Sequence, residues 1–462
     1  MIAVNSSGKP NLSVLQITLI VALGGLLMGY DAATVATSQM YFTQYFGFTP
    51  VQQGWVISSA GYGCFLGAIS AGYLTSTLSR KYTLIVAAVL YIISAVGSGV
   101  ADSLLILVGY RIILGLSIGM IAMTSPMYIA EISPSSIRGK MVTYHQLAMV
   151  IGFILPFMVS FLINTGDISH SDRVAYGWRL MFWTEIVPAV IFFALLFYIP
   201  HSPRWLIFKG RNHQAKTVLD QLAEDKSEAK TEYELIAKSL AETKAPSRKL
   251  LFKNGLGYAL FLGIMLAIFQ QATGIVAILI YSGEIFSQAL GYDPKQALMP
   301  QLWVGIVNLI FTFVAIYKVD SWGRKPLLIG GTLGMFFGLS VLALSVYTQQ
   351  EGLLSLIGVL VFVGAFAMSM GPVVWVILAE IFPNNVRSLA MSITIGAQCL
   401  TSALVTNGFP ILHKSHFNTL NFNGALPYFL FASVCIIAIL FVWRLVPETK
   451  GKSLEEMEQI WR

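Results

Sequence analysis

Twelve runs of about 20 mostly apolar residues divide this chain of 462 residues. A helix needs about 20 apolar residues to cross the hydrocarbon of a bilayer, and its backbone polar groups then bond within the helix. The runs therefore predict an all-α integral membrane protein with twelve transmembrane helices. They lie near residues 13–35, 54–76, 83–101, 104–128, 141–163, 180–200, 256–287, 299–318, 326–347, 353–378, 389–410 and 425–446.

The charged residues support the same interpretation. Only 11% of the residues are charged, whereas soluble domains contain about 25%. The net charge of +7 lies in the segments between the apolar runs. A basic balance there is typical of loops that face anionic cytoplasmic lipid, so we expect the lipid bilayer as a partner and no nucleic acid. If the N-terminus is inside, the outer loops carry few basic residues, namely Arg173, Arg179, Lys295 and Lys414. Both termini are therefore expected in the cytoplasm.

Three motifs of the predicted inner loops occur twice at similar spacing. The pair RK at residue 80 returns 244 residues later, and AEISPSSIR at residue 130 returns as AEIFPNNVR 249 residues later. PHSPR at residue 200 is matched by PETKG 247 residues later. These repeats predict two six-helix bundles with a solute site between them. We expect an N-terminal bundle at 12–200, a cytoplasmic helical linker at 201–253, a C-terminal bundle at 254–447 and a cytoplasmic tail at 448–462.

Three ionisable residues lie within apolar runs: Asp31 in the first, Arg111 in the fourth and Glu185 in the sixth. An unpaired charge at the bilayer centre costs about 3 kcal/mol or more, so such residues face a partner or a wet cavity. If both carboxylates compete for Arg111, protonation of one frees the guanidinium for the other, which couples a proton to a change in packing. A static pair that only neutralises Arg111 is the alternative, and these residues alone leave both open.

Uncharged polar side chains and one tryptophan also interrupt the runs, at Gln146, Gln270, Gln271, Asn308, Trp375 and Gln398. Amides both donate and accept hydrogen bonds, and an indole offers a flat apolar face, which together suit a neutral polyhydroxylated solute. Each glutamine alone also fits a bond between two helices. No basic residue lies among them, which disfavours an anionic solute.

Glycine and proline predict irregular backbone in two runs. QQATG at 270–274 and GPVVW at 371–375 predict breaks or bends in the seventh and tenth runs. Irregular backbone is tolerated at membrane depth where it lines a cavity, although Pro372 alone would explain an ordinary kink. In the fourth run, Gly115 and Gly119 share one helix face and predict a close-packing seam.

Charged residues recur in the inner loops of both halves, and we expect them to form a cytoplasmic latch that holds the halves together when the inner mouth is closed. They are Arg80, Glu131, Arg138, Arg204, Asp320, Arg324, Glu380, Arg387 and Glu448. Solvated loop charges worth about 0–1 kcal/mol each are the alternative.

The three cysteines, Cys64, Cys399 and Cys435, each lie in an apolar run without metal-ligand spacing. An odd, scattered set does not suggest a disulfide framework. We expect all three to be small packing residues, and we expect no metal and no cofactor.

The chain resembles the sugar porter family of the major facilitator superfamily in segments spread from about residue 24 to residue 460. They are GGLLMGYDAATVA, RIILGLSIG, PMYIAEISPSSIRG, PHSPR, QQATG, DSWGRK, GPVVW, AEIFPNNVR and VPETKG. The resemblance implies the major facilitator fold and alternating access by rocking of the two bundles. It implies that Asp31, Arg111 and Glu185 form a proton-coupling set, since facilitative relatives have an uncharged residue in place of Asp31. It also implies that the six polar residues named above contact a sugar.

Several positions depart from the family pattern. In the pocket, family residues that form hydrogen bonds or present an aromatic face are replaced in this chain by Met28, Phe153, Val276, Ile280 and Cys399. These changes favour a less hydroxylated ligand or one held in another pose. In the inner loops, Ser76, Ser79 and His201 replace an Asp, a Gly and a Glu, which predicts a weaker latch in the N-terminal half.

We therefore expect a monomeric secondary active transporter of a bacterial inner membrane that carries a neutral monosaccharide, a pentose or a hexose, together with a proton. A passive sugar uniporter and a proton-coupled symporter of a cyclic polyol such as inositol are the alternatives. We do not expect an enzyme, because the sequence contains no nucleophile elbow, phosphate loop or metal cluster.

Overall fold

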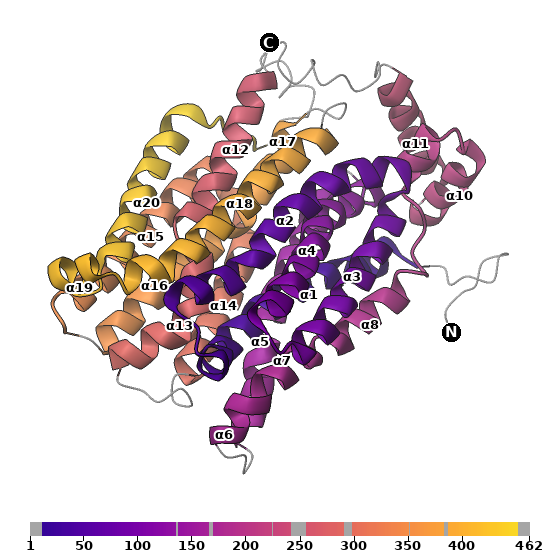
Figure 1. Ribbon diagram of the computed structural model, residues 1–462. Helices are drawn as coiled ribbons and strands as arrows, with labels where there is room; N and C mark the ends of the chain where they lie inside the picture. Colours follow the sequence, from indigo (N-terminus) through magenta and orange to yellow (C-terminus); the bar gives the residue numbers. More distant parts are fainter. Residues whose placement is uncertain are drawn as a thin grey trace.

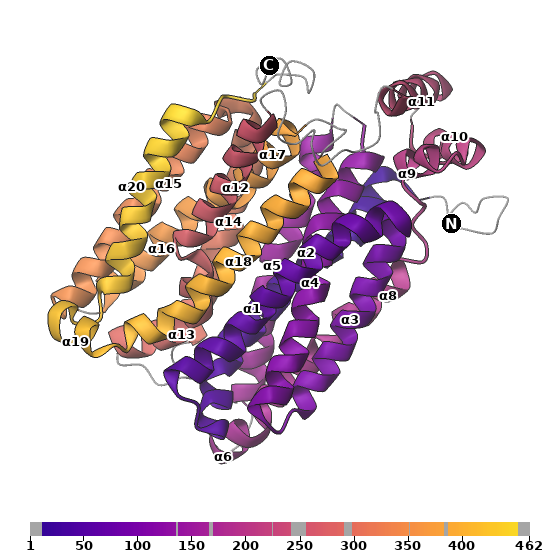
Figure 2. The ribbon, with the colours of Figure 1, turned by 45° about the horizontal axis from the view of Figure 1, so that its top comes forward.

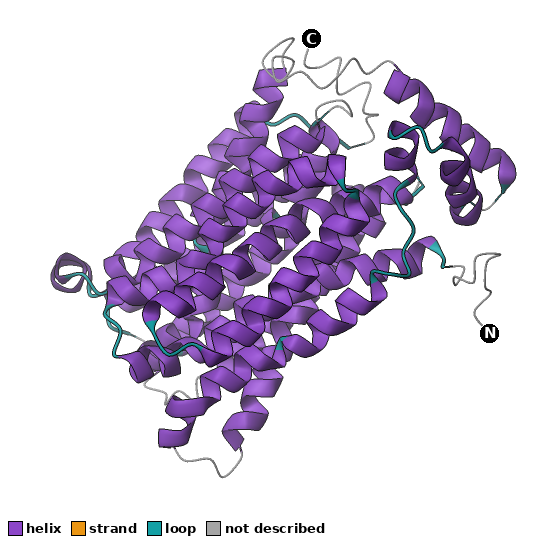
Figure 3. Ribbon diagram, turned by 45° about the vertical axis from the view of Figure 1, so that its right-hand side comes forward, coloured by secondary structure: helices purple, strands orange, loops and turns teal. Residues whose placement is uncertain are grey.

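The computed structural model describes residues 12–134, 137–165, 170–223, 225–241, 256–290, 298–350, 352–382 and 387–450. Within these ranges the regular elements are helices, and Figure 3 shows them joined by short loops. This agrees with the all-α fold predicted from the apolar runs.

The N-terminal half contains α1 to α8, and the C-terminal half contains α12 to α20. The bounds in the N-terminal half are α1 Val14–Phe46, α2 Pro50–Thr77, α3 Arg80–Val100, α4 Leu104–Ile132, α5 Arg138–Thr165, α6 His170–Asp172, the π-helix η1 Arg173–Gly177, α7 Trp178–Thr184 and α8 Ile186–Leu195. Those in the C-terminal half are α12 Leu256–Ala272, α13 Ile275–Leu290, α14 Leu298–Trp322, α15 Arg324–Tyr347, α16 Leu353–Met368, α17 Met370–Ile381, α18 Arg387–His413, α19 His416–Phe422 and α20 Leu426–Leu445.

Eleven helical stretches of the described residues are long and apolar enough to cross a membrane. Helix α2 adds a twelfth stretch of 28 residues. Its glycines, serines and glutamines make it less apolar, and it packs between α4 and α18. The twelve predicted spans therefore correspond to observed helices.

Both predicted backbone irregularities are present. The seventh span is broken between α12 and α13, where Gly274 has a φ of +86° that favours glycine. The tenth span is broken at Ser369, between α16 and α17. Pro372 lies in the first turn of α17, where a missing N–H is tolerated.

The same contacts recur in the two halves. In the N-terminal half α1 packs on α5, α2 on α4 and α3 on α4. The corresponding contacts in the C-terminal half are α12 with α18, α14 with α16 and α15 with α16. Figures 1 and 2 show the halves side by side, the first indigo to magenta and the second red to yellow. They meet where α2 contacts α18, α5 contacts α14 and α1 contacts α13.

The predicted glycine seam lies between α2 and α4. A Cβ atom on Gly115 would be 2.0 Å from the carbonyl oxygen of Ala60, and one on Gly119 would be 2.2 Å from that of Cys64. Neither position has room for a side chain, so the two helices approach at backbone distance.

Three short helices, α9 Pro203–Phe208, α10 Asn212–Leu222 and α11 Lys226–Ala241, follow the N-terminal half. A small core of their own, centred on Trp205, Leu206 and Ala215, holds them together. Figure 1 shows α10 and α11 beyond one end of the bundles and α6 and α19 at the other. We call the first of these the linker end.

Candidate functional site

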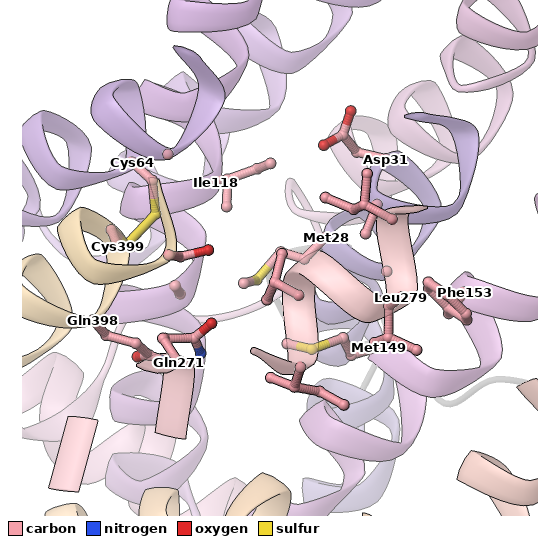
Figure 4. Close-up of a pocket in the computed structure, with 18 of the residues that line it drawn as sticks. Met28, Asp31, Cys64, Ile118, Met149, Phe153, Gln271, Leu279, Gln398 and Cys399 are labelled. Atoms are coloured by element: carbon pink, nitrogen blue, oxygen red, sulfur yellow. A yellow bond between two sulfur atoms is a disulfide. The ribbon is translucent and has the colours of Figure 1, made fainter. Parts of the chain in front are cut away.

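A cavity of about 250 Å³ lies between the two halves. All six polar residues predicted to contact a solute line it, and so do Asp31 and Arg111. The six come from five different spans, with Gln146 on α5, Asn308 on α14, Trp375 on α17, and the other glutamines on α12 and α18. Figure 4 shows part of this lining, with Gln271 and Gln398 on one side and Asp31 on the other.

Arg111 on α4 forms an ion pair with Asp31 on α1. Both terminal nitrogens of the guanidinium take part: Nη1 donates to Oδ1, and Nη2 donates to Oδ2 at 3.3 Å. The side chains of Arg111 and Asp31 are 3% and 7% exposed, so the pair is removed from bulk solvent. Removing one partner of such a buried pair strongly destabilises the fold, because the other charge is left buried without compensation.

Glu185, the third predicted coupling residue, lies between α7 and α8, where the backbone keeps right-handed helical angles (φ −63°, ψ −24°). Pro188 follows three residues later and offers no N–H, so one helix bond is missing there. Glu185 is fully buried, beside the hydroxyls of Thr34 and Tyr91 and within electrostatic reach of the Asp31–Arg111 pair. Neither of its carboxyl oxygens has a hydrogen-bond partner among the described residues, and it does not line the cavity.

The glutamines differ in how much of their bonding capacity the protein uses. Gln270 donates from Nε2 to the carbonyl oxygens of Met370 at 2.8 Å and Gly371 at 3.2 Å. Its Oε1 accepts from Nε2 of Gln398 at 2.6 Å. The carbonyl oxygen of Gln271, by contrast, is buried without a partner among the described residues. Gln270 therefore ties α12 to the start of α17, whereas Gln271 donates only to Oε1 of Gln270 at 3.4 Å and keeps an unused acceptor.

The two walls of the cavity differ in polarity. The wall from the C-terminal half carries most of the amides, together with Ser402 and Thr406. The wall from α1, α4 and α5 is formed largely by apolar side chains, including Met28, Ile118 and Met149. All five positions at which the pocket departs from the family pattern line the cavity: Met28, Phe153, Val276, Ile280 and Cys399.

Met149 and Val150 were not singled out from the sequence. They lie three and four residues after Gln146, and Phe153 lies seven after it, so all four share one face of α5. This helical spacing from Gln146 is the sequence signal that indicates Met149 and Val150 as further pocket residues.

The prediction for the cysteines is wrong for two of the three. Cys64 on α2 and Cys399 on α18 form a disulfide between the two halves, with Cα atoms 5.7 Å apart. Cys435 is free and buried, as a packing residue would be. The pairing joins residues 335 positions apart and depends on how the halves meet, so spacing along the chain carries no sign of it.

The charges at the linker end form two matching clusters. In the N-terminal half, Glu131 accepts from Arg80 at 2.8 Å and from the hydroxyl of Ser202. In the C-terminal half, Glu380 accepts from Arg324 at 2.9 Å and from the hydroxyl of Thr449. Ser202 and Thr449 are 247 residues apart, the offset of the third sequence repeat.

Both clusters join helices within one half. The side chains of Arg138, Asp320 and Arg387 lie outside the described residues, and Arg204 is on α9. A latch that crosses from one half to the other therefore stays a prediction.

The two clusters differ where His201 in the first corresponds to Glu448 in the second. Glu448 accepts from the backbone N–H groups of Arg324 at 2.9 Å and Lys325 at 3.0 Å, at the start of α15. Burial raises the pKa of the Glu448 carboxyl, but hydrogen bonds from these groups and from the Lys450 N–H outweigh it, so the pKa lies below its ordinary value of 4.5. His201 instead stacks on Trp205, and its Nδ1 lies 3.1 Å from Oγ of Ser79.

Two membrane-spanning helical bundles around a central cavity lined with amides define a membrane carrier for a small solute. The model of the family described as "Sugar (and other) transporter" matches residues 17–461. The chain therefore belongs to this family of sugar transporters, within the major facilitator superfamily. It is a multi-pass integral membrane sugar transporter and not an enzyme.

Named relatives cover nearly the whole chain. It is 38% identical over 475 residues to the D-xylose-proton symporter of Escherichia coli (strain K12), which covers 97% of this chain and 96% of the relative. It is 34% identical to the glucose facilitated diffusion protein of Zymomonas mobilis, over 97% and 98%. The solved structure of the proton:xylose symporter bound to 6-bromo-6-deoxy-D-glucose matches with a TM-score of 0.87 and 38% identity, over 97% of this chain and 99% of that one.

Proposed function

We propose that this protein couples the movement of a neutral monosaccharide to that of a proton, in the same direction, by alternating access. The observation that carries the proposal is the buried Asp31–Arg111 ion pair on the cavity wall, with a second buried carboxyl, Glu185, close behind it. Similarity to relatives named as proton symporters of xylose, arabinose and galactose supports it.

The proposed coupling follows from the energetics of buried charge. One guanidinium cannot neutralise two carboxylates, and a buried carboxylate without a partner is strongly unfavourable. When Asp31 takes up a proton from the cavity, Arg111 is released toward Glu185, which changes the packing of α4 against α1 and α7. A static ion pair would be equally buried but would gain nothing from the second carboxyl.

The proposed sugar site is the amide-lined wall of the cavity. The unpaired carbonyl oxygen of Gln271 would accept from a sugar hydroxyl, and Gln398 and Asn308 add further polar groups. Trp375 offers an apolar face for the C–H surface of the ring. Gln146 would reach the solute from the opposite half, so closure around it would bring the halves together.

We further propose that the carrier works as a monomer in a bacterial inner membrane with both termini in the cytoplasm. The basic linker segment supports this orientation, since cytoplasmic loops carry the excess of lysine and arginine.

Uptake by purified protein in liposomes tests the coupling. With an inward proton gradient, addition of D-xylose or D-glucose to the wild type is expected to alkalinise the external medium and to drive accumulation. Asp31→Asn removes the titratable group but keeps the hydrogen-bonding shape, so it is expected to abolish accumulation while exchange of internal for external sugar persists.

Asp102→Asn is the matched control, because Asp102 is an exposed carboxylate just before α4. It is expected to accumulate sugar as the wild type does. Sugar flux in the wild type that is indifferent to the proton gradient would instead indicate a passive uniporter, as in the relative named for facilitated diffusion. Accumulation retained in Asp31→Asn would remove Asp31 from the coupling role.

A further inference from the structure

Most uncharged polar groups of the cavity lie on the C-terminal half, although that half also contributes apolar residues such as Val276, Leu279 and Ile280. Gln271, Gln398 and Asn308 belong to the C-terminal half, and the N-terminal wall facing them presents Met28, Met149 and Ile118. Figure 4 shows Met28 and Met149 on the opposite side of the space from Gln271 and Gln398. A bound sugar therefore finds most of its hydrogen-bonding partners in the C-terminal half, whereas the N-terminal wall offers it mainly thioether and aliphatic groups.

The few polar groups of the N-terminal wall do little to change its apolar character. Asp31 and Arg111 are bonded to each other. Among the described residues of that wall, Gln146 is the one uncharged amide. A hydroxyl directed at Met28 or Met149 would lose its water without gaining a partner, because a thioether sulfur is only a weak acceptor. A methyl group in the same place would gain contacts with flexible, polarizable side chains that adapt to its shape.

We propose that the preferred substrate is a 6-deoxyhexose, a hexopyranose whose exocyclic carbon is a methyl group. This inference rests on the proposed sugar-transport function and adds the substrate class. The ring hydroxyls face Gln271, Gln398 and Asn308, and the exocyclic methyl faces Met28 and Met149. Loss of the single hydroxyl on the exocyclic carbon removes the group that this wall cannot bond.

The test compares sugars that differ only in that hydroxyl. The pairs are 6-deoxy-D-glucose with D-glucose, 6-deoxy-D-galactose with D-galactose, and L-rhamnose with L-mannose. Dissociation constants are measured on the purified full-length protein by quenching of tryptophan fluorescence, since Trp375 lines the cavity. We expect at least one 6-deoxy sugar to bind about 10- to 100-fold more tightly than its hydroxylated partner.

Two variants assign the preference to the wall. Met149→Gln keeps the length of the side chain but places an amide opposite Gln271, so the ratio of the two dissociation constants is expected to fall by about tenfold. Met149→Leu keeps the wall apolar and is expected to retain the wild-type ratio.

The outcomes separate this inference from the function on which it rests. If the wild type binds hydroxylated and 6-deoxy sugars equally, or prefers the hydroxylated ones, the 6-deoxyhexose assignment is overturned and sugar transport stands. If D-xylose binds but no sugar in any pair does, the assignment is overturned and sugar transport stands, whereas if neither D-xylose nor any sugar in a pair binds or exchanges, both are overturned. The wild-type comparison decides the assignment even if a variant does not fold.

Discussion

At the scale of single residues, chemically identical side chains perform different tasks in this cavity. Gln270 and Gln271 are adjacent, yet one has its amide bonded to Met370, Gly371 and Gln398 and the other keeps a buried acceptor without a partner. The sequence indicated that both amides belong to a polar site. It gave no way to tell them apart, because the difference depends on which of the two amides lies within reach of the first carbonyl groups of α17.

This difference predicts two distinct mutant phenotypes. Gln270→Leu removes the two hydrogen bonds from Nε2 to the carbonyls of Met370 and Gly371 and leaves Nε2 of Gln398 without its acceptor, and each lost hydrogen bond costs about 0.5–1.5 kcal/mol. We expect a lower melting temperature in detergent together with weaker sugar binding. Gln271→Leu removes only the long bond of 3.4 Å from its Nε2 to Oε1 of Gln270, so it is expected to weaken binding of sugar with little change in the melting temperature. Equal melting temperatures for the wild type and Gln270→Leu would refute this assignment.

At the scale of helices, periodicity and breakers predicted most of the elements. Gly274 and Pro372 marked the two broken spans, and the starts of α4 and α16 fall at their predicted positions. The end of α1 was missed by eleven residues. Its last turns contain Thr37, Ser38 and Gln39, which break the apolar run.

Those polar residues are satisfied inside the protein. Ser38 bonds back to the carbonyl of Thr34 at 2.6 Å, and Gln39 donates from Nε2 to the carbonyl of Ile280 on α13 at 2.7 Å. A hydropathy pattern cannot anticipate a partner from the other half, so it ended the helix too early.

The start of α15 gives a pH-dependent prediction. Because the pKa of Glu448 is lowered in the folded protein, its ionised form stabilises the fold above its ordinary pKa of 4.5, and this contribution is lost as the pH falls through the lowered pKa. Glu448→Gln is therefore expected to lower stability at pH 7, by about 0.5–1 kcal/mol for a charge at a helix N-terminus. At pH 3 the difference from the wild type should shrink.

Melting curves at the two pH values check this prediction. Glu234→Gln, which changes an exposed acid on α11, is the control and should match the wild type at both. A deficit of Glu448→Gln that is as large at pH 3 as at pH 7 would contradict a role for the charge.

At the scale of the whole molecule, the internal repeat extends from sequence to contacts. The offsets near 247 residues predicted two related bundles, and the paired helices and the clusters at Glu131 and Glu380 repeat accordingly. The repeat could not predict the contacts between the two bundles, because residues at that junction contact the other half and these contacts are not repeated within either half. The Cys64–Cys399 disulfide belongs to that junction.

The disulfide predicts the thiol content of the protein. Denatured, unreduced wild type is expected to react with one equivalent of maleimide, at Cys435, and with three after reduction. Cys64→Ser frees Cys399, so the unreduced variant is expected to react with two. Mass spectrometry of the labelled protein counts the additions, and three additions without reduction would show that the bond is not formed.

Under the proposed alternating access, the position of this bond determines which movements of the two halves it permits. Cys64 lies near the midpoint of α2 and Cys399 near that of α18, and small residues let the same two helices touch at either side of it, Gly61 against Ala403 and Gly72 against Ser392. Two helices joined at their midpoints can still tilt relative to each other, whereas a second bond nearer their ends prevents that tilt. We therefore expect turnover to persist with the native disulfide oxidised. A second cross-link between Gly72→Cys and Ser392→Cys is expected to stop turnover until a reductant is added.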